Sequence, residues 1–141
     1  MSAGNKPPAF LDSNVWLYAS LRDDPQKRQT AATLISRIAP VVSTQVINEV
    51  CSNLIRKAGY SNARSRRLVS AFYRRCPVIA FDRDLFLDAA DLRDRHSLSY
   101  WDSLIVAAAD RAGVPVLYSE DLQDGLVIRN RLRIENPFKV P

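Results

Sequence analysis

The feature that most constrains this chain is an alternation of short apolar runs with stretches of helical spacing. The apolar runs predict buried strands and lie at residues 9–11, 41–42, 78–81 and 116–118. The stretches with helical spacing of apolar residues lie at about residues 25–38, 47–58, 62–75, 85–92 and 101–112. Short strands that alternate with helices are typical of a parallel sheet with helices on both faces. The sequence therefore predicts the α/β class.

Particular residues mark where these elements begin and end. Asp12, Ser13 and Asn14 follow the first apolar run and are of the types that cap the start of a helix. Pro40 is expected to end the helix before it, because proline lacks the N–H that a helix interior needs. Near the C-terminus, residues 131–134 are expected to form an edge strand.

The length of 141 residues suits one domain with one sizeable core. We expect a flexible N-terminal segment over residues 1–8 and a single α/β domain over residues 9–141. The longest apolar run, Leu104–Ala109, is far shorter than the ~20 residues of a membrane-spanning helix. No apolar region of a secretory signal follows the polar start of the chain, so a cytoplasmic location is expected.

Counts of individual residue types exclude several kinds of site. The two cysteines, Cys51 and Cys76, have apolar neighbours, which favours two buried thiols over a disulfide. The single histidine, His96, is expected at a helix end, and the spacing matches no zinc site. The four glycines form neither a dinucleotide-binding pattern nor a P-loop, which excludes both kinds of nucleotide chemistry.

The net charge of +5 is unevenly distributed along the chain. Residues 50–81 contain seven basic residues and no acid, whereas residues 82–124 contain ten acids and four basic residues. A basic flank beside an acidic concentration suits a protein that attracts a polyanion and also holds cations. Solvated helix faces would give the same pattern. Sixteen of the twenty basic residues are arginine, which slightly favours a nucleic-acid partner.

Acidic residues follow two of the predicted strands. Asp12 comes after the first strand and Asp121 after the fourth, where ligands of open α/β sheets bind. Either residue alone would be taken for a helix cap. Asp102 lies in the first turn of a predicted helix, beside its apolar face, and is either a cap or a carboxylate that needs a cation or hydrogen-bond donors. Glu49 lies off the apolar stripe of its helix, so spacing alone predicts that it faces solvent.

A cluster of these four carboxylates would need cations, because mutual repulsion would raise their pKa values or disrupt the fold. Carboxylate oxygens without His or Cys ligands suit Mg²⁺ or Mn²⁺. Two such ions, about 3.5–4 Å apart, can hold the attacking water and the leaving oxygen of a phosphodiester in line. This hydrolysis needs no nucleophilic Ser or Cys and no His base, and the sequence has none in a recognisable arrangement.

The contexts of the four acids resemble those of the PIN-domain nucleases, in particular the VapC-type ribonuclease toxins of bacterial toxin–antitoxin pairs. The similarity extends from about Ala9 to Phe138. The matching stretches are, in order, Phe10-Leu11-Asp12-Ser13-Asn14-Val15, Ile47-Asn48-Glu49-Val50, residues 100–109, residues 117–125 and Asn136-Pro137-Phe138.

The resemblance implies an α/β/α sandwich around a parallel sheet of four to five short strands. It also implies a pocket for Mg²⁺, or for Mn²⁺, in which Asp12 and Asp102 are the principal ligands. Asp121 would complete the coordination directly or through water, and Glu49 would orient or deprotonate the attacking water. All four acidic positions match the family, so the resemblance implies an active enzyme.

The resemblance further implies partners for the chain. These are a second copy in a homodimer, a small cognate antitoxin in the groove near the acids, and a structured RNA such as a transfer RNA or a ribosomal RNA loop. Cleavage would leave a 3′-hydroxyl and a 5′-phosphate. The basic region from Arg56 to Arg75 would serve either RNA phosphates or the antitoxin. Asp124 and Ser119 are further candidates for the site.

The main alternative is a non-catalytic RNA- or protein-binding module of the same fold, whose acids only bind basic side chains of an antitoxin. Two other classes with an early aspartate do not match. A haloacid-dehalogenase-like phosphatase would have a second Asp at the position of Asn14, and a receiver domain would have a lysine after a late strand. Trp16 and Trp101 are expected in the core rather than as platforms for stacked bases.

Overall fold

The structure, a computed structural model, describes residues 5–139. Its strands are β1 (Pro8–Leu11), β2 (Ala39–Ser43), β3 (Val78–Ile79), β4 (Val116–Tyr118), β5 (Val127–Ile128) and β6 (Leu132–Glu135). Its helices are α1 (Ser13–Ser20), α2 (Pro25–Arg37), α3 (Thr44–Ala58), α4 (Asn62–Arg75), α5 (Arg83–Arg95) and α6 (Tyr100–Ala112). The expected flexible segment, residues 1–8, lies partly outside the described residues, and Pro8 is the first residue of β1.

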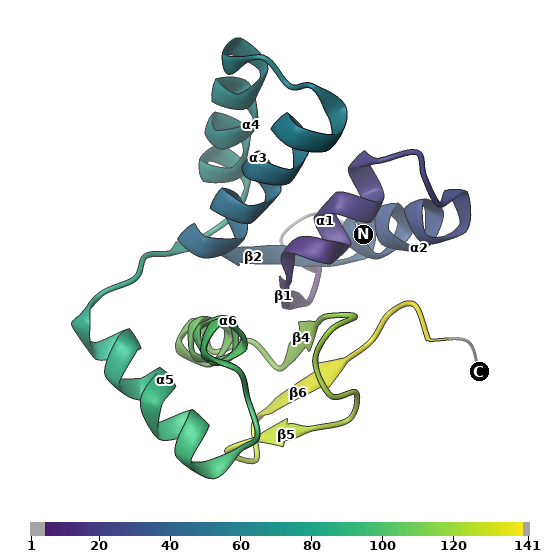
Figure 1. Ribbon diagram of the computed structural model, residues 1–141. Coiled ribbons are helices and arrows are strands. Elements are labelled where there is room, and N and C mark those ends of the chain that lie inside the picture. Colours follow the sequence, from purple (N-terminus) through teal and green to yellow (C-terminus); the bar gives the residue numbers. More distant parts are fainter. Residues whose placement is uncertain (1–4, 140–141) are drawn as a thin grey trace.

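The six strands of this range form one sheet in the order β3-β2-β1-β4-β6-β5 (Figure 1). Strand β1 lies inside the sheet and is parallel to both of its neighbours, so that Phe10 stands opposite Val41 of β2 and Leu117 of β4. Only β5 runs antiparallel to its neighbour, β6. The sheet is therefore mostly parallel, and the predicted α/β class is confirmed.

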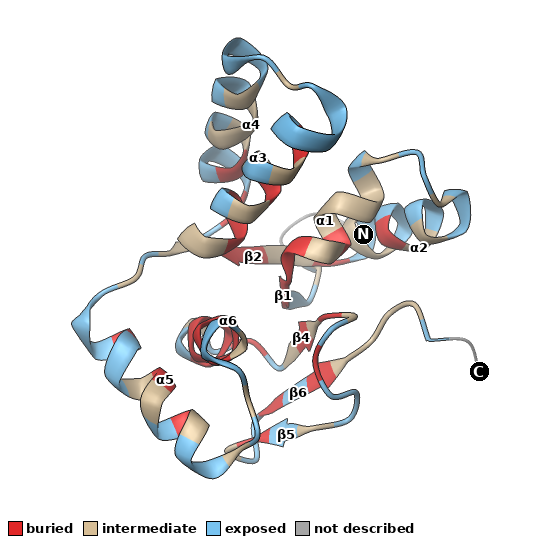
Figure 2. Ribbon diagram, viewed as in Figure 1, coloured by how far each residue is buried: buried red, intermediate tan, exposed pale blue. Residues whose placement is uncertain are grey.

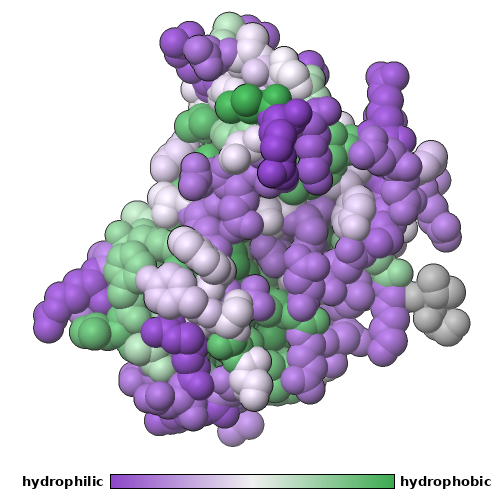
Figure 3. Space-filling view, viewed as in Figure 1, coloured by the Kyte–Doolittle hydropathy of each residue, from purple (hydrophilic) through white to green (hydrophobic). Residues whose placement is uncertain are grey.

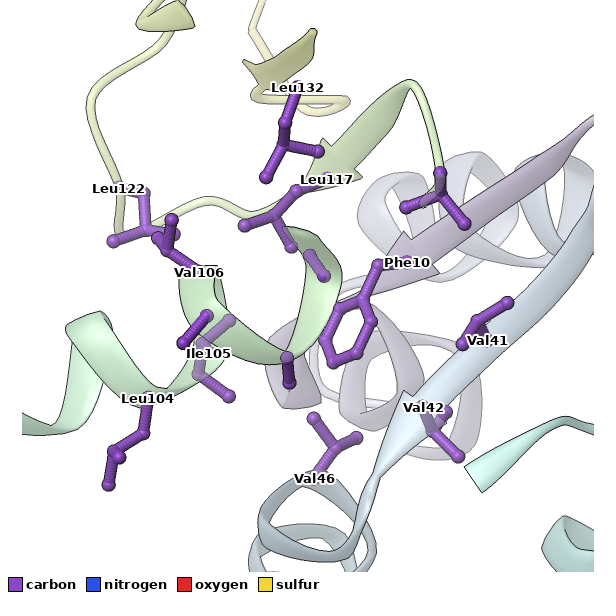
Figure 4. Close-up of a cluster of buried hydrophobic side chains, with 14 of the residues drawn as sticks. Phe10, Val41, Val42, Val46, Leu104, Ile105, Val106, Leu117, Leu122 and Leu132 are labelled. Carbon is purple, nitrogen blue, oxygen red and sulfur yellow. The ribbon is translucent and has the colours of Figure 1, made fainter. Parts of the chain in front are cut away.

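Helices cover both faces of the sheet, because side chains alternate along each strand. Ala9 and Leu11 of β1 belong to a buried cluster that includes Val15 of α1 and Ala31 of α2. Phe10, between them, points to the other face and packs in the larger cluster with residues of α3, α5 and α6 (Figure 4). This arrangement is the expected α/β/α sandwich.

Helix α6 is the most deeply buried helix of the described range. Every residue from Ser103 to Asp110 is buried, and the helix lies between the sheet and α5 (Figure 2). By contrast, only Phe72 is buried in α4, which packs on α3 as an outlying hairpin. Among residues 5–139, no helix combines the length and the apolar character that crossing a membrane requires.

The sheet has six strands in the described range rather than four to five, because β5 folds back onto β6. Arg129 and Asn130 form the connecting turn with φ of 52° and 57°, and Arg131 N donates to Ile128 O over 3.1 Å. These values are typical of a type I′ turn, whose twist suits a hairpin. The strand expected at residues 131–134 is therefore present as β6, but its expected edge position is wrong, because it lies between β4 and β5.

The helix expected to end before Pro40 does so, but the strand after it begins two residues before the predicted residues 41–42. Helix α2 ends at Arg37, and Pro40 lies in β2 opposite Ala9 of β1. Strand β3 extends only alongside Val42 and Ser43, so the missing N–H of Pro40 removes no bond to β3. Strand β3 itself contains only residues 78–79 of the predicted 78–81.

Both cysteines are free thiols, as expected, with Cys76 buried and Cys51 half-buried. His96 is the C-cap of α5, also as expected. Trp16 is half-buried and packs edge-on against Phe72, with ring centroids 5.1 Å apart. The expectation of a core position for Trp101 is wrong, since 65% of this residue is exposed.

Candidate functional site

Parallel strands bring polar residues together at one edge of the sheet. Asp12 directly follows β1, and Ser119 directly follows the neighbouring strand β4. The N–H of Asp12 donates to Tyr118 O over 3.0 Å, which continues the pairing of these strands by one step. Ser43, at the end of β2 on the other side of β1, caps α3 by accepting from Val46 N. This edge is where open α/β sheets hold their ligands.

Asp12 is a buried carboxylate, with 6% of the residue exposed. Its Oδ1 accepts from Ser13 N over 2.7 Å, and its Oδ2 accepts from Ser119 Oγ over 2.8 Å. Burial raises the pKa of this carboxyl to about 6, although both hydrogen bonds lower it; the nearby charges of Glu49 and Asp121 raise it further. Asp12 is therefore costly to ionise unless a cation is close.

Glu49 lies in α3, one helical turn after Gln45, and is half-buried. Its Oε2 accepts from Ser13 Oγ over 3.2 Å and its Oε1 accepts from Gln45 Nε2 over 2.9 Å. The expectation from helical spacing that Glu49 faces solvent is wrong, because α3 packs against α1, whose first residue is Ser13. Ser13 thus connects Glu49 to Asp12, its neighbour in the chain.

Asp121 approaches Asp12 through Ser119. Its N–H donates to Ser119 Oγ over 3.2 Å, and the same hydroxyl donates to Asp12. Asp121 Oδ2 accepts from Asn14 Nδ2 over 3.2 Å, which ties the loop after β4 to the first turn of α1. Glu49 and Asp121 are therefore each linked to Asp12 through one serine, Ser13 for Glu49 and Ser119 for Asp121.

Asp102 is half-buried in the first turn of α6. Its alternative role as the helix cap is not observed, because the N-cap is Ser99, whose Oγ accepts from Asp102 N over 3.1 Å. The Asp102 carboxylate has no hydrogen bond or ion pair with any residue of the described range. A long contact of 3.5 Å from Gln45 Nε2 to Trp101 O joins the start of α6 to Glu49.

The four acids are not neutralised by the chain itself: none of them pairs with a lysine or arginine in the described residues. They also do not form a ready ligand set, since no three His, Cys, Asp or Glu side chains within residues 5–139 make a group that could hold a metal ion as they stand. Glu49 and Asp121 instead direct oxygens at Ser13, Gln45 and Asn14.

Of the two further candidates, Ser119 belongs to this network and Asp124 does not. Asp124 Oδ1 accepts from Asn136 N over 2.8 Å, and its Oδ2 pairs with Lys139 Nζ at 3.1 Å. The hydrogen bond from Asn136 and the contact with Lys139 hold the pKa of Asp124 below its usual value. Asp124 therefore fastens the C-terminal segment.

Three residues of the network were not singled out as site residues from the sequence. Ser13 and Asn14 were assigned to helix capping, although each side chain instead bonds an acid of the site. The sequence analysis gave Gln45 no role. Its position four residues before Glu49 in the same helix could have predicted the hydrogen bond between their side chains.

The sequence matches the family model described as the PIN domain over residues 9–123. The chain therefore belongs to the PIN-domain family, and the resemblance found in the sequence is confirmed. A comparison with curated proteins gives no match.

Solved structures with the same fold include several toxin–antitoxin proteins. A toxin–antitoxin complex from Klebsiella pneumoniae has 18% identity and a TM-score of 0.70, covering 94% of this chain and 99% of that chain. The sarcin-ricin loop cleaving toxin VapC20 of Mycobacterium tuberculosis has 20% identity and a TM-score of 0.65, covering 80% and 91%. VapBC2 from Rickettsia felis, bound to a DNA fragment from its promoter, has 18% identity and a TM-score of 0.61, covering 92% and 98%.

Proposed function

We propose that this protein is a metal-dependent endoribonuclease, the toxin of a toxin–antitoxin pair, and that a cognate antitoxin inhibits it. The observation that carries the proposal is the buried Asp12 carboxylate. It lies at the ligand-binding edge of the sheet beside Glu49 and Asp121, its pKa is raised to about 6, and no cationic side chain of the described range pairs with it. A carboxylate in this setting suits a bound cation.

The donor set fits Mg²⁺ or Mn²⁺, since it consists of carboxylate, hydroxyl and amide oxygens without a His or Cys ligand. In this proposal Asp12 and Asp102 are the principal ligands, and Asp121 completes the coordination directly or through water. Asp102 has no partner in residues 5–139 to give up, whereas Asp121 would exchange its bond from Asn14. When bound, the metal supplies Lewis acidity and an activated water.

The chain's own residues would orient the reacting groups. Ser13 N and Ser119 Oγ fix the two oxygens of Asp12, so that this carboxylate needs little rearrangement to bind a cation. Gln45 holds Glu49 Oε1, which leaves Oε2, now bonded to Ser13 Oγ, to accept a proton from the attacking water. Hydrolysis of the phosphodiester then leaves a 3′-hydroxyl and a 5′-phosphate.

The classes of substrate and partner are proposed from proteins of the same fold. VapC20 is described as cleaving the sarcin-ricin loop, which supports a ribosomal RNA loop, with transfer RNA as the other structured candidate. The complexes from Klebsiella pneumoniae and Rickettsia felis support an antitoxin as the protein partner. A homodimer in the cytoplasm completes the proposal.

The test is incubation of the purified chain with total RNA in Mg²⁺, in Mn²⁺ and in EDTA, followed by mapping of new 5′ ends. Asp102→Asn should reduce cleavage by about 100-fold or more, because a charge that stabilises the reacting groups is lost. Asp91→Asn is the matched control, since Asp91 is an exposed acid of α5. Discrete, metal-dependent cuts that only Asp102→Asn removes would support the nuclease.

The opposite result would favour the non-catalytic module. Folded, antitoxin-free protein that makes no cuts, or Asp12→Ala protein that still cleaves RNA, would overturn the metal-nuclease proposal. Antitoxin binding by Asp12→Ala separates the two further, because a module that uses its acids only to hold basic side chains would lose that partner.

A further inference from the structure

Two exposed aromatic side chains stand at the start of α6, next to Asp102. Trp101 is 65% exposed and Tyr100 is 49% exposed. The backbone carbonyl of Trp101 is the one that Gln45 approaches, and Gln45 also holds Glu49. The large aromatic surface therefore adjoins the candidate site through both the chain and this contact.

Arg93 and Ser103 fix the position of Tyr100, the first residue of the aromatic pair. The Arg93 guanidinium lies over the Tyr100 ring at 4.9 Å from its centroid and donates to Ser103 Oγ over 2.7 Å. The buried Ser103 hydroxyl in turn donates to Tyr100 O over 2.6 Å. Tyr100 and Trp101 meet edge to face, with centroids 5.3 Å apart and planes at 88°. Trp101 is thus supported on one side and open to solvent over most of its surface.

Polar groups lie close to the aromatic pair, namely the Arg93 guanidinium at Tyr100 and the Gln45 amide at the Trp101 carbonyl. The exposed apolar residues of α5, Phe86 and Leu87, lie near the start of that helix, whereas Arg93 lies near its end. At the start of α5, Asp82 pairs with Arg111 of α6 at 2.9 Å. Phe86 and Arg93 are seven positions apart along the helix, a rise of about 10 Å. Figure 3 shows hydrophobic residues over α5 and residues of intermediate hydropathy in front of α6. The aromatic pair therefore differs in hydropathy from the exposed apolar residues of α5 beside it.

We propose that Trp101, supported by Tyr100, is a stacking platform for one unpaired nucleobase of an RNA substrate. The proposal rests on the proposed nuclease function and specifies the part of the RNA that the site takes. A flat, exposed aromatic ring binds the face of a base without reading its identity. The neighbouring Arg93 and the exposed basic residues of the α3–α4 hairpin, none of which forms an ion pair within residues 5–139, complement the RNA backbone.

The platform selects looped or single-stranded RNA over a continuous duplex. A base inside a duplex is already stacked on its neighbours and cannot cover Trp101 unless it is unpaired first. The phosphodiester presented to Asp102 and Glu49 is then the one that flanks an unstacked base.

Binding measured in EDTA separates this platform from cleavage. Equilibrium binding of a fluorescently labelled RNA hairpin and of a fully paired RNA duplex is compared for the full chain and for Trp101→Ala, Trp101→Phe and Phe86→Ala. Trp101→Ala should bind the hairpin about 5- to 150-fold more weakly, the range for one lost base–aromatic contact. Trp101→Phe should retain most of the affinity, and duplex binding should change little. Phe86 is the matched control, an exposed aromatic of α5 (43%) outside the α3–α4 hairpin.

A second readout uses tryptophan fluorescence. Hairpin RNA should quench the emission of the unmodified chain, and Trp101→Phe should lose this quenching, because the remaining Trp16 packs against Phe72. Equal hairpin affinity of Trp101→Ala and the unmodified chain would overturn the proposal. So would a shift of Trp101→Ala to a smaller oligomer in light scattering, which would assign the ring to contact with a second copy.

Failure of the platform and failure of the nuclease give different results. Metal-dependent cuts together with unchanged hairpin RNA binding by Trp101→Ala would disprove the stacking platform and support the nuclease. Loss of hairpin affinity and of quenching in a chain that makes no cuts would remove the nuclease and retain the base-stacking site.

Discussion

At the scale of single residues, Asp12 has two roles at once. Its Oδ1 caps α1 through Ser13 N, as the sequence predicted for a polar residue after a strand. Its other oxygen faces Ser119 at the same edge as Glu49 and Asp121, where burial makes its charge unfavourable. A cap alone would be equally well formed by Asn or Ser. The aspartate adds a negative charge that capping does not need.

The raised pKa of Asp12 predicts how metal-free stability depends on pH. A folded pKa of about 6 against 3.8 in the unfolded chain means that protonation stabilises the fold. The contribution is fully present below about pH 4, is lost as pH rises through 6, and amounts to about 3 kcal/mol. In EDTA, the free energy of unfolding of the unmodified chain should therefore fall between pH 5 and 7.5 relative to that of Asp12→Asn.

Urea unfolding at the two pH values measures this difference. Asparagine caps helices as well as aspartate does, so the variant retains the bond from Ser13 N. Addition of Mg²⁺ at pH 7.5 should stabilise the unmodified chain more than the variant. Parallel pH profiles for the two proteins would contradict the assignment of the titration to Asp12.

Asp102 leads to a different expectation, because Ser99 already caps α6. Its carboxylate contacts no partner in residues 5–139, so Asp102→Ala should leave the metal-free thermal midpoint unchanged or slightly higher. Ser99→Ala removes the actual cap and should cost about 1 kcal/mol. Thermal unfolding in EDTA measures both. A marked loss of stability in Asp102→Ala would mean that the carboxylate stabilises the helix after all.

The candidate site was only partly predictable from residue types and spacing. Asp12 and Asp121 were found because they follow apolar strands, and parallel strands end at a common edge. Glu49 was found only through the family resemblance, since a helical wheel cannot show that another helix packs against the polar side of a helix. Trp101 was placed wrongly for the converse reason. The apolar stripe of α6 continues into its first turn, while its buried residues begin at Ser103.

At the scale of elements, a group of charged residues joins α5, α6 and the β5–β6 turn. Asp110 has a side chain only 4% exposed and accepts hydrogen bonds from Arg131 Nε at 2.8 Å and from Arg129 Nη1 at 2.6 Å. Arg129 also pairs with Asp88 of α5 at 2.7 Å. Hydrogen bonds from Arg131 and then Arg129 hold the pKa of Asp110 below its usual value, although burial opposes them.

Asp110→Asn should therefore destabilise the protein by about 1–3 kcal/mol, less than for a fully buried pair because Arg131 is largely exposed. The lowered pKa of Asp110 means that its contribution is present above about pH 4 and is lost as pH falls through the folded value. Acid titration of stability should be shallower in the variant. Asp88→Asn is the control and should lower the free energy of unfolding by less, because Arg129 still pairs with Asp110 in that variant. Equal losses in the two variants would show that Asp110 is not the centre of the group.

Long elements were predicted more accurately than short ones. The helix over residues 62–75 was predicted with the bounds that α4 has, because a cap precedes it and a proline follows it closely. Strand β5 was missed, since two residues carry no periodicity and its turn uses Arg129 and Asn130 instead of glycine. The start of β2 at Ala39 is not predicted from the sequence, because a proline can lie in a strand where the neighbouring strand is shorter.

At the scale of the whole molecule, the basic part of the sequence forms a positively charged surface on the α3–α4 hairpin. All seven basic residues of the α3–α4 hairpin are exposed, namely Arg56, Lys57, Arg64, Arg66, Arg67, Arg74 and Arg75. None of them forms an ion pair within the described part of the chain. Helix α3 also carries Glu49 near its start, so the cations and the candidate site share one helix (Figure 1). Charges without acidic partners are available to a polyanion.

We expect these cations to contact RNA phosphates, and salt dependence tests this. Arg66→Glu combined with Arg67→Glu should weaken hairpin RNA binding and lower the slope of log affinity against log salt by about 1.5, because two phosphate contacts are lost. Arg28→Glu combined with Arg37→Glu makes the same change of net charge on α2, on the opposite face of the sheet, and should leave the slope nearly unchanged. Equal slopes for the two double variants would mean that only net charge matters. An unchanged slope for Arg66→Glu combined with Arg67→Glu, together with lost antitoxin binding, would mean that the α3–α4 helices bind the antitoxin and not RNA.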